Sequence, residues 1–517
     1  MGYIHYRIYR AGIPLFLNLL LLLPMAVLGQ EKEQFPVFIT DSLEQYIVTG
    51  MAEWKIPGLS VAIIKNNNVV LSKGYGVTRA HDTVPVDENT LFMIGSLTKQ
   101  FTATALSMIA ESSSFSLTDK VQRWLPEFRL KDPYASKEAN IIDLLSHRLG
   151  FDAFQGSFVH WTSRLTRAEI IESMSRIAAP NDFRSSWGYS NAAYVAAGEL
   201  IPKVTGRTWR EVVRDSILKP LKMHRTLTLS ATLSGNSNVA RPHALVNNEL
   251  VEVPVNQIDN IAASGSMSST VKDLSNWLYA QLNNGWLLGE PILPIRSVGA
   301  IRQPHNLVDL DERMGRRTRF NLYGLGLFIR DVHGKLEYYH DGSVEGYTAV
   351  LSYIPEEQLG VVILTNTNNF FAQSLLNKIQ DTYLGINPED YTVKSAIGRG
   401  SVNTVRDQRI DSLRAIDNRL VPKLPTKAII GNYSNTAYGQ IAIRRQQNDL
   451  ILHFSEHPDL IGKLEHLHDA TYLCTFSNPL FGRSEVPFYV LNNKVLGFDF
   501  KVDPRIEYSE YEFIKTR

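Results

Sequence analysis

Cysteine is almost absent from this chain of 517 residues, because Cys474 is the only one. A single cysteine cannot close an internal disulfide or build a cysteine-rich metal site, so packing must hold the fold together. An excess of charge of either sign is also missing: 53 Lys and Arg balance 52 Asp and Glu, and the formal net charge is +1. This balance gives no attraction to nucleic acid, and we expect no nucleic-acid partner.

Long apolar runs are missing everywhere except near the N-terminus. There Arg7 and Arg10 precede a leucine-rich run at 13–28, and a polar stretch follows Gly29. This pattern predicts a secretory signal peptide over residues 1–29 and a secreted or periplasmic protein. An uncleaved membrane anchor is the alternative, and it would be the only link to a membrane. Three residues in the run are unfavourable for a spanning helix: Pro14, Asn18 and Pro24.

The first motif with chemical meaning is Ser96-Leu97-Thr98-Lys99. It opens an apolar pattern that predicts a helix over 97–111. Side chains three residues apart on a helix are neighbours, and a desolvated lysine is a neutral amine that can take a serine proton. The alternative is a serine that only caps the helix. The same spacing recurs at 216–219 and 269–272, which we interpret as surface turns of ordinary helices.

The second motif is Tyr189-Ser190-Asn191, placed before an apolar helical run at 192–200. A tyrosine hydroxyl beside a lysine can share proton transfer, and the Asn191 amide can bond both the lysine and a substrate carbonyl. The alternative is a plain helix start in which Asn191 caps and Tyr189 packs. The repeat of this tripeptide at 433–435 lies in a strand-rich region, and we interpret it as structural.

The third motif is His340-Asp341-Gly342. It is predicted to end a strand over 335–340, which follows a strand expected over 323–330, and the next strand is expected to start at Gly346. Gly342 would let a substrate approach the strand edge, and the backbone N–H of Ser343 would pair with that of Ser96 as an oxyanion hole. The alternative is a hairpin turn with a satisfied histidine.

The order of these motifs, together with their flanking segments, resembles a family. The chain is similar to the penicillin-recognising serine hydrolases, in the branch of class C β-lactamases, D-aminopeptidases and D-Ala-D-Ala carboxypeptidases. The resemblance covers about residues 38–384. The further segments that carry it are Leu91–Gly95, Ile142–Gly150 (IDLLSHRLG), Pro220–Met223 (PLKM), Ala263–Thr270 with Asp273, and Tyr323–Gly326 (YGLG).

The motifs and the resemblance together imply an acyl-transfer site that needs no metal or organic cofactor. Ser96 attacks a carbonyl, Lys99 is the base, and Tyr189 shares proton transfer to the leaving group. Asn191 orients the lysine and the substrate, and His340 helps Tyr189 or a polar group of the substrate. The expected substrate is a small molecule or peptide. The competing class is a binding or scaffolding protein that keeps the fold without turnover.

Two departures from the family pattern bear on the substrate. The third motif is usually Lys-Thr-Gly, and a histidine near neutral pH holds a substrate carboxylate only in part. This favours a D-amino-acid peptidase, an amidase or an esterase over a β-lactamase, which stays the second choice. The segment Phe183-Arg184-Ser185-Ser186 also replaces the usual Pro-Gly turn before Tyr189, and we interpret it as a loop variant near the pocket.

The layout predicts an α+β hydrolase domain over 30–386, in which helices flank an antiparallel sheet and an all-helical lobe is inserted between strands. Residues 387–425 are polar and aperiodic, which predicts a linker. Residues 426–517 alternate strongly and predict a small all-β barrel or sandwich, and the similarity to the lipocalin-like domain of some family members favours the barrel. The strands expected there are 439–444, 450–454, 472–476, 488–491, 495–500 and 508–514.

Overall fold

The structure is a computed structural model of the chain. It describes residues 2, 35–246, 249–310, 318–386, 409–413, 424–492, 494–504 and 506–516. The signal peptide expected over 1–29 lies outside the described residues except for residue 2. The linker expected over 387–425 is described only at a short helix, 409–413, and at its last two residues. No helix within the described ranges combines the length and the apolar character needed to cross a bilayer.

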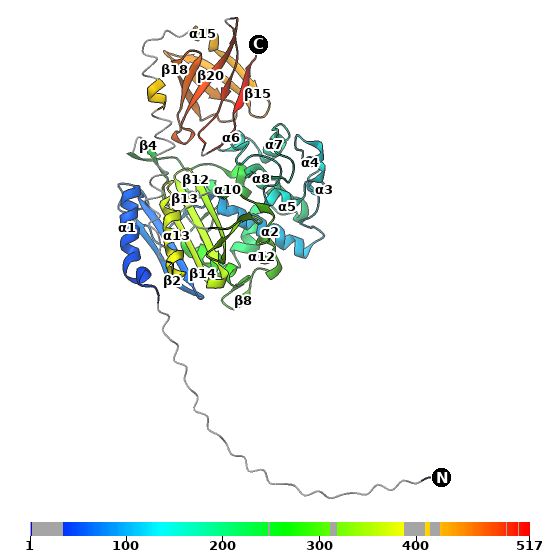
Figure 1. The fold of residues 1–517 in the computed structure, drawn as a ribbon, viewed down its shortest axis with the longest axis vertical. Helices are drawn as coiled ribbons and strands as arrows, with labels where there is room; N and C mark the ends of the chain where they lie inside the picture. The colour runs from blue at the N-terminus through cyan, green and yellow to red at the C-terminus, as the bar shows by residue number, and fades with distance from the viewer. Residues whose placement is uncertain are drawn as a thin grey trace.

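The centre of the hydrolase domain is an antiparallel sheet of eight strands (Figure 1). The first strand of the domain and the last one pair with each other near one edge of the sheet, with Val61 opposite Ile363. In spatial order the strands are β2 (Asn68–Gly76), β1 (Gly58–Lys65), β14 (Leu359–Thr365), β13 (Tyr347–Ile354), β12 (Lys335–Val344), β11 (Phe328–Val332), β10 (Asn321–Tyr323) and β9 (Asn306–Leu307).

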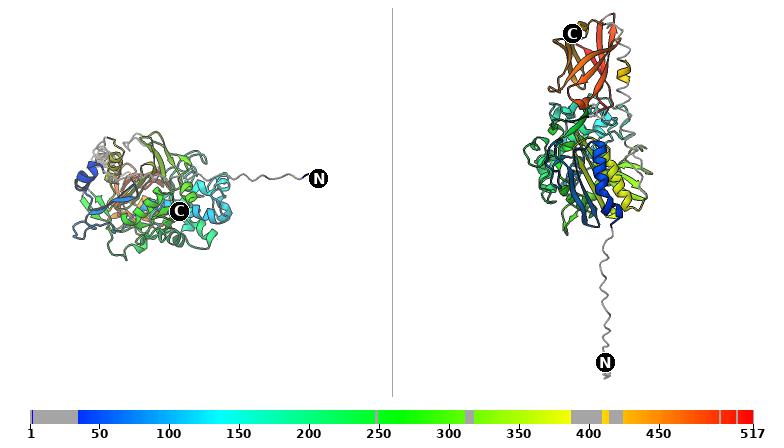
Figure 2. Two further views of the ribbon diagram at one scale, coloured as in Figure 1. Left: turned by 90° about the horizontal axis from the view of Figure 1, so that it is seen from below. Right: turned by 90° about the vertical axis from the view of Figure 1, so that its left-hand side faces the viewer.

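Helices cover both faces of this sheet, and the alternation of side chains along β1 explains why. Val61 and Ile63 pack with α1 (Leu43–Trp54) and α13 (Phe371–Tyr383) on one face. Ala62 and Ile64, which alternate with these residues along the strand, point to the opposite face and join the core of the helical lobe. The right-hand view of Figure 2 shows α1 and α13 side by side on the sheet. The predicted α+β class is therefore confirmed.

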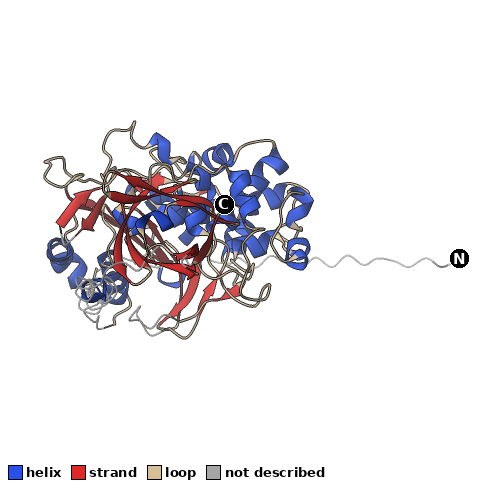
Figure 3. Ribbon diagram, turned by 90° about the horizontal axis from the view of Figure 1, so that it is seen from above, coloured by secondary structure: helices blue, strands red, loops and turns tan. Residues whose placement is uncertain are grey.

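The helical lobe covers the opposite face and gathers on one side of the molecule (Figure 3). Its core is apolar and includes Phe101 and Trp277, whose ring centroids lie 4.3 Å apart. Its helices are α2 (Thr98–Ser112), α3 (Val121–Trp124), α4 (Pro133–Glu138), α5 (Ile141–Leu145), α6 (Ser157–His160), α7 (Arg167–Ser173), α8 (Asn191–Thr205), α9 (Trp209–Val213), α10 (Ala262–Gly265), α11 (Val271–Leu282) and α12 (Ile295–Ile301).

Two strand predictions near the site are wrong in their bounds. The strand expected to end at His340 continues to Val344, because residues 340–344 pair in register with β13. The strand expected over 323–330 is broken into β10 and β11. The break lies at Gly326, whose φ is +76° and whose added Cβ would lie 2.6 Å from the carbonyl oxygen of Lys99. A side chain at position 326 would therefore collide with the backbone of the helix that carries Lys99.

The C-terminal region is a closed barrel of eight strands. The six expected strands are present, which confirms the all-β barrel. Two strands, β15 and β18, were not among the six. The bounds are β15 (Gly431–Asn435), β16 (Gly439–Gln446), β17 (Asp449–Phe454), β18 (Ile461–His468), β19 (Thr471–Phe476), β20 (Arg483–Leu491), β21 (Lys494–Phe500) and β22 (Tyr511–Lys515). The barrel lies against the helical lobe at α6 (Figure 1).

The close contact between β12 and the segment before Ser96 depends on Gly342. A Cβ added there would lie 2.0 Å from the carbonyl oxygen of Ile94. We therefore expect Gly342→Ala to lower the free energy of unfolding by about 1–3 kcal/mol, because β12 must move away. Gly299→Ala is the control, since Gly299 lies in α12 with no atom within 4 Å of an added Cβ, and helix propensity should stabilise it by about 0.5–1 kcal/mol. Urea unfolding measures both, and equal effects would contradict the assigned contact.

Candidate active site

The predicted nucleophile lies at the start of a long buried helix. Ser96 occupies a short 3₁₀ turn, Gly95–Leu97, that leads directly into α2. The turn is held by Thr98, whose hydroxyl donates to the carbonyl of Gly95 at 2.7 Å. Gly95 has a φ of +51°, and an added Cβ would lie 2.9 Å from the backbone nitrogen of Ser343. The helix therefore starts one residue later than expected, and Ser96 lies beside β12.

Lys99 lies in the first turn of α2 and is fully buried. Its Nζ is 3.2 Å from Ser96 Oγ, 2.8 Å from Asn191 Oδ1 and 2.9 Å from the carbonyl oxygen of Ser264. Two of these partners only accept, whereas the serine hydroxyl can also donate. A neutral amine has two N–H bonds and one lone pair, so this arrangement directs the lone pair at the Ser96 proton.

The protonation of Lys99 follows from its burial. Desolvation lowers the pKa of Lys99 well below its usual 10.5, and the carboxyl of Asp341 opposes this shift only in part. The aromatic rings of Tyr189 and Tyr194 lie 4.6 and 5.3 Å from its Nζ. The lysine is therefore suited to accept a proton from Ser96.

The pKa of Tyr189 is shifted in the opposite direction to that of Lys99. Its side chain is buried, and desolvation raises the pKa of its hydroxyl, while a hydrogen bond with the Ser96 side chain lowers it. A neutral phenol beside a neutral amine is a proton donor. The structure thus brings Ser96, Lys99, Tyr189 and Asn191 together, as the sequence predicts. Within this group, Lys99 is suited to accept a proton and Tyr189 is suited to donate one.

His147 also belongs to this site, although no role was predicted for it. Its Nδ1 accepts the backbone N–H of Ser190 at 3.1 Å, and its ring lies 4.4 Å from the ring of Tyr189. Burial lowers its pKa well below 6.5, so it is a neutral ring that supports the second motif. Ser264 was missed as well, because a backbone carbonyl leaves no signal in the side-chain pattern.

His340 makes its hydrogen bonds to groups other than Tyr189. Its Nδ1 lies 2.5 Å from the carbonyl oxygen of Asp341, and its Nε2 lies 3.1 Å from the hydroxyl of Tyr323. Nδ1 therefore carries the hydrogen, and Nε2 accepts from Tyr323. Burial and the nearby Lys99 lower the pKa of His340 to about 3. The third motif thus carries no positive charge near neutral pH.

Gly342 and Ser343, which the sequence predicts beside an oxyanion, lie next to the turn that carries Ser96. An added Cβ at Gly342 would lie 3.2 Å from the backbone nitrogen of Ser96, so β12 and the turn of the nucleophile touch along their backbones. Gly342 was expected to leave room for a substrate, whereas in the structure its lack of a side chain leaves room for the backbone of Ile94 and Ser96. Asn368 supports the end of β12 by donating to the side chain of Ser343 at 3.0 Å and to the carbonyl of Val344 at 2.9 Å.

Asp341 is the charged group that this site presents to solvent. Its side chain is exposed, as is that of Ser343 two residues later on the same strand. The carboxyl is nonetheless close enough to Lys99 and Tyr189 to influence the pKa of both. Partial desolvation raises its own pKa, and Arg330 and Lys99 lower it. The side of the site beside β12 is therefore acidic.

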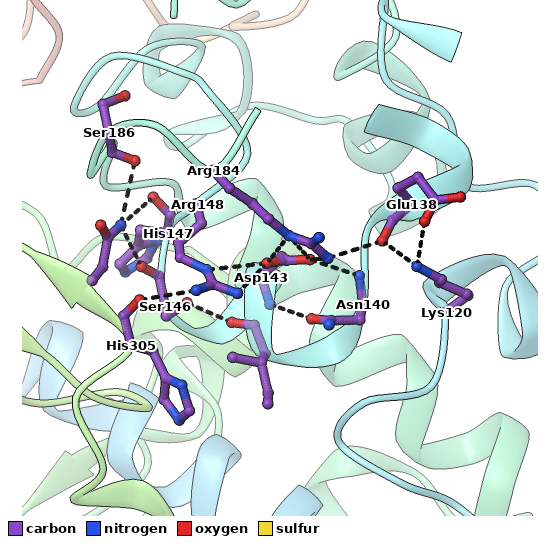
Figure 4. A network of polar contacts seen from close by, with 12 residues as sticks. Lys120, Glu138, Asn140, Asp143, Ser146, His147, Arg148, Arg184, Ser186 and His305 are labelled. Carbon is purple, nitrogen blue, oxygen red and sulfur yellow. Dashed lines mark hydrogen bonds and ion pairs between the residues drawn. The ribbon is translucent and has the colours of Figure 1, made fainter. Parts of the chain in front are cut away.

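The segment before Tyr189 is anchored by a buried carboxylate, as Figure 4 shows. Asp143 accepts from Arg148 and Arg184, with the shortest distances 2.7 Å to each. Arg184 belongs to the segment 183–186 that replaces the Pro-Gly turn of the family, and its ion pair with Asp143 holds this segment in place. Asn306 adds hydrogen bonds to the carbonyls on both sides of this network, including that of Ser186 at 3.3 Å.

The two repeated Ser-x-x-Lys patterns are placed away from the site. Ser216 and Lys219 lie in and just after a π-helical turn, Arg214–Leu218, and Lys219 pairs with Asp215. Ser269 was expected on a surface turn, but it is a buried residue of the short strand β6 (Ser268–Ser269). Tyr433 begins the second copy of the tripeptide, and it lies inside β15, in the strand-rich region that the sequence predicts. In the described part of the chain no cluster of three His, Cys, Asp or Glu is arranged to hold a metal ion.

Residues 43–383 match the profile of the β-lactamase family, which is more than half of the chain. The chain belongs to the β-lactamase family. Residues 417–515 match a second profile, described as a domain of unknown function (DUF3471). This β-lactamase-family chain is accordingly a serine hydrolase.

Among curated relatives, the unguisins hydrolase ungD of Aspergillus violaceofuscus is 27% identical over 459 residues, 82% of this β-lactamase-family chain and 80% of that protein. An octameric penicillin-binding protein homologue from Pyrococcus abyssi has a TM-score of 0.58 and 25% identity, and the match covers 92% of this chain and 99% of that one. A D-stereospecific amidohydrolase from Streptomyces sp. shares the fold, with a TM-score of 0.53, 22% identity and coverage of 66% and 98%.

The neutral state of His340 makes stability depend on pH. Between its folded pKa of about 3 and the ordinary value of 6.5, the unfolded chain binds a proton that the folded chain does not. Stability therefore falls as the pH decreases through this window. We expect His340→Gln to reduce the slope of unfolding free energy against pH, between pH 4 and 6, by about 1.4 kcal/mol per unit. His333→Gln, at an exposed turn, is the control. Identical slopes for both variants would refute the assignment.

Proposed function

We propose that this chain cleaves an amide or ester bond through an acyl-enzyme on Ser96. The observation that carries the proposal is the position of Lys99 Nζ, 3.2 Å from Ser96 Oγ and otherwise bound to two acceptors. Ser96 Oγ attacks the substrate carbonyl carbon while its proton passes to the Lys99 amine. The resulting oxyanion would be stabilised by the backbone N–H groups of Ser96 and Ser343.

The remaining steps follow from the opposite pKa shifts of Lys99 and Tyr189. As the tetrahedral intermediate breaks down, the Tyr189 hydroxyl gives its proton to the departing amine or alcohol, and the Lys99 ammonium returns a proton to Tyr189. Water then attacks the acyl-enzyme, again giving a proton to Lys99, and Ser96 recovers its hydrogen on release of the acid. Every proton is returned, so these residues close the cycle.

The charges around the site favour certain substrates. A substrate carboxylate beside β12 would meet the exposed Asp341 and no cation on the neutral His340. A free amine or an uncharged group would be accepted there. We therefore propose a D-amino-acid peptidase, amidase or esterase, and we place β-lactamase activity second. The names of the relatives, a hydrolase and an amidohydrolase, support this order.

The proposed roles of Ser96 and Lys99 predict a loss of activity on substitution. Ser96→Ala and Lys99→Ala should each reduce kcat by about 10⁴-fold or more, because nucleophile and base act as one unit. Mass spectrometry after incubation with a serine-directed phosphonate should find the label on Ser96. Ser216→Ala and Lys219→Ala are matched controls with the same spacing, and they should keep full activity. An unmodified wild-type chain under forcing conditions would favour the scaffold alternative.

The charge of Asp341 predicts a change of substrate preference. Asp341→Asn should reduce the ratio of kcat/KM for D-alanine p-nitroanilide to that for its N-succinyl derivative by about tenfold, since one charge contact is removed. Asp82→Asn, at an exposed position far along the chain, removes the same charge as a control. An unchanged ratio would refute the role of Asp341. Fast hydrolysis of nitrocefin by the wild type would reverse the proposed order of activities.

A further inference from the structure

One side chain of the hydrolase domain fills an end of the barrel. Phe158, in α6, is fully buried and belongs to the apolar core of the barrel. Its ring is stacked on Tyr438 and His457, with centroids 4.7 and 5.0 Å away. Further rings around it are Phe454, Phe481, Phe500 and Tyr511. These residues lie where β17 and β21 end and β22 begins, so the hydrolase domain itself occupies this end of the barrel.

A buried carboxylate of the barrel holds the same loop. Glu507 has no exposed surface, and its two oxygens accept the backbone N–H groups of Gly156 at 2.7 Å and Phe158 at 2.8 Å. The hydroxyl of Tyr511 donates to it at 2.9 Å. A buried carboxylate without such donors would be strongly unfavourable. Glu507 and the loop therefore satisfy each other.

Two further contacts extend this attachment beyond α6. The ring of His457 lies between the hydroxyl of Tyr438 at 2.7 Å and the carbonyl oxygen of Trp161 at 2.9 Å. The backbone N–H of Arg164 donates to the carbonyl of Glu456 at 2.9 Å. The loop is thus fixed to the barrel along residues 156–164.

The other end of this loop supports the second motif of the active site. The backbone N–H of Phe154 donates to the carbonyl of Tyr189 at 2.7 Å, and the two rings lie 5.0 Å apart. Phe154 in turn accepts the backbone N–H of Ser157 at 2.9 Å. It has a φ of +64°, which is unfavourable for a bulky residue and persists only where both sides are held. Tyr189 and Glu507 are therefore joined by one short, hydrogen-bonded loop.

We propose that the barrel acts as a clamp that positions Tyr189, with Glu507 and Phe158 as positioning residues. The proposal rests on the proposed role of Tyr189 as the proton donor to the leaving group. Neither positioning residue touches the reacting atoms. Their effect passes through residues 154–158, so it falls on the proton transfer by Tyr189 and spares the attack by Ser96.

The test compares two substrates with the same D-alanyl group, a p-nitroanilide and a p-nitrophenyl ester, on the full chain. The anilide needs a proton on its leaving nitrogen, whereas p-nitrophenolate leaves without one. Glu507→Ala and Phe158→Ala should therefore reduce kcat for the anilide about tenfold more than kcat for the ester. Rates are divided by the active fraction, measured by phosphonate labelling of Ser96. Glu507→Gln and Phe158→Leu should recover part of the ratio.

The matched control is Phe488→Ala in the core of the same barrel. Phe488 packs on Tyr433, Tyr472 and Phe498, and it makes no ring contact with Phe158. It should weaken the barrel yet leave the ratio of anilide to ester unchanged. If the alanine variants do not fold, Phe158→Leu and Glu507→Gln provide the comparison. If the phosphonate labels Ser96 of the wild type but all variants have the same ratio of anilide to ester turnover, the clamp is wrong and the proposed function stands. An unlabelled wild type would overturn the proposed function, and the clamp with it.

Discussion

The burial of a single amine is the interaction on which the rest of the site depends. Lys99 has no exposed surface, and its Nζ is bound by two acceptors and by the hydroxyl of Ser96. Removing water from this amine lowers its pKa and makes it a base, and the same dry surroundings keep the Tyr189 phenol protonated. The same buried environment thus produces both a base and an acid, because it lowers the pKa of an amine and raises the pKa of a phenol.

That environment is built mostly from backbone contacts. Gly95, Gly326 and Gly342 each stand where a Cβ would approach the backbone of a neighbouring segment within 3 Å. Because these approaches leave no gap, α2, β12 and the turn between β10 and β11 enclose the lysine. The polar groups left over are then satisfied by backbone atoms, such as the carbonyl of Ser264 toward Lys99. The result is a buried site with few free charges, apart from Asp341 at its exposed side.

The sequence predicted the parts of this arrangement that depend on side-chain type and local spacing. Ser96 and Lys99 are one helical turn apart, and Tyr189 with Asn191 begins a helix, so their motifs were visible. The extension of β12 beyond His340 was not, because it depends on pairing with β13. The neutral state of His340 also requires its tertiary partner Tyr323. In the barrel, short strands such as β15 were not predicted, because they are defined by their pairing with neighbouring strands and only weakly by their residue pattern.

The pairing of β1 with β14 has a consequence for synthesis. Val61 finds its neighbour Ile363 only after some three hundred further residues have left the ribosome, and the wall of the site at β12 also emerges late. Such distant pairing slows the assembly of the sheet and delays it until the domain is nearly complete. A truncated nascent chain can carry Ser96 and Lys99 without the strand beside them. Hydrolytic competence therefore arrives late, when the chain is long enough to close its own sheet.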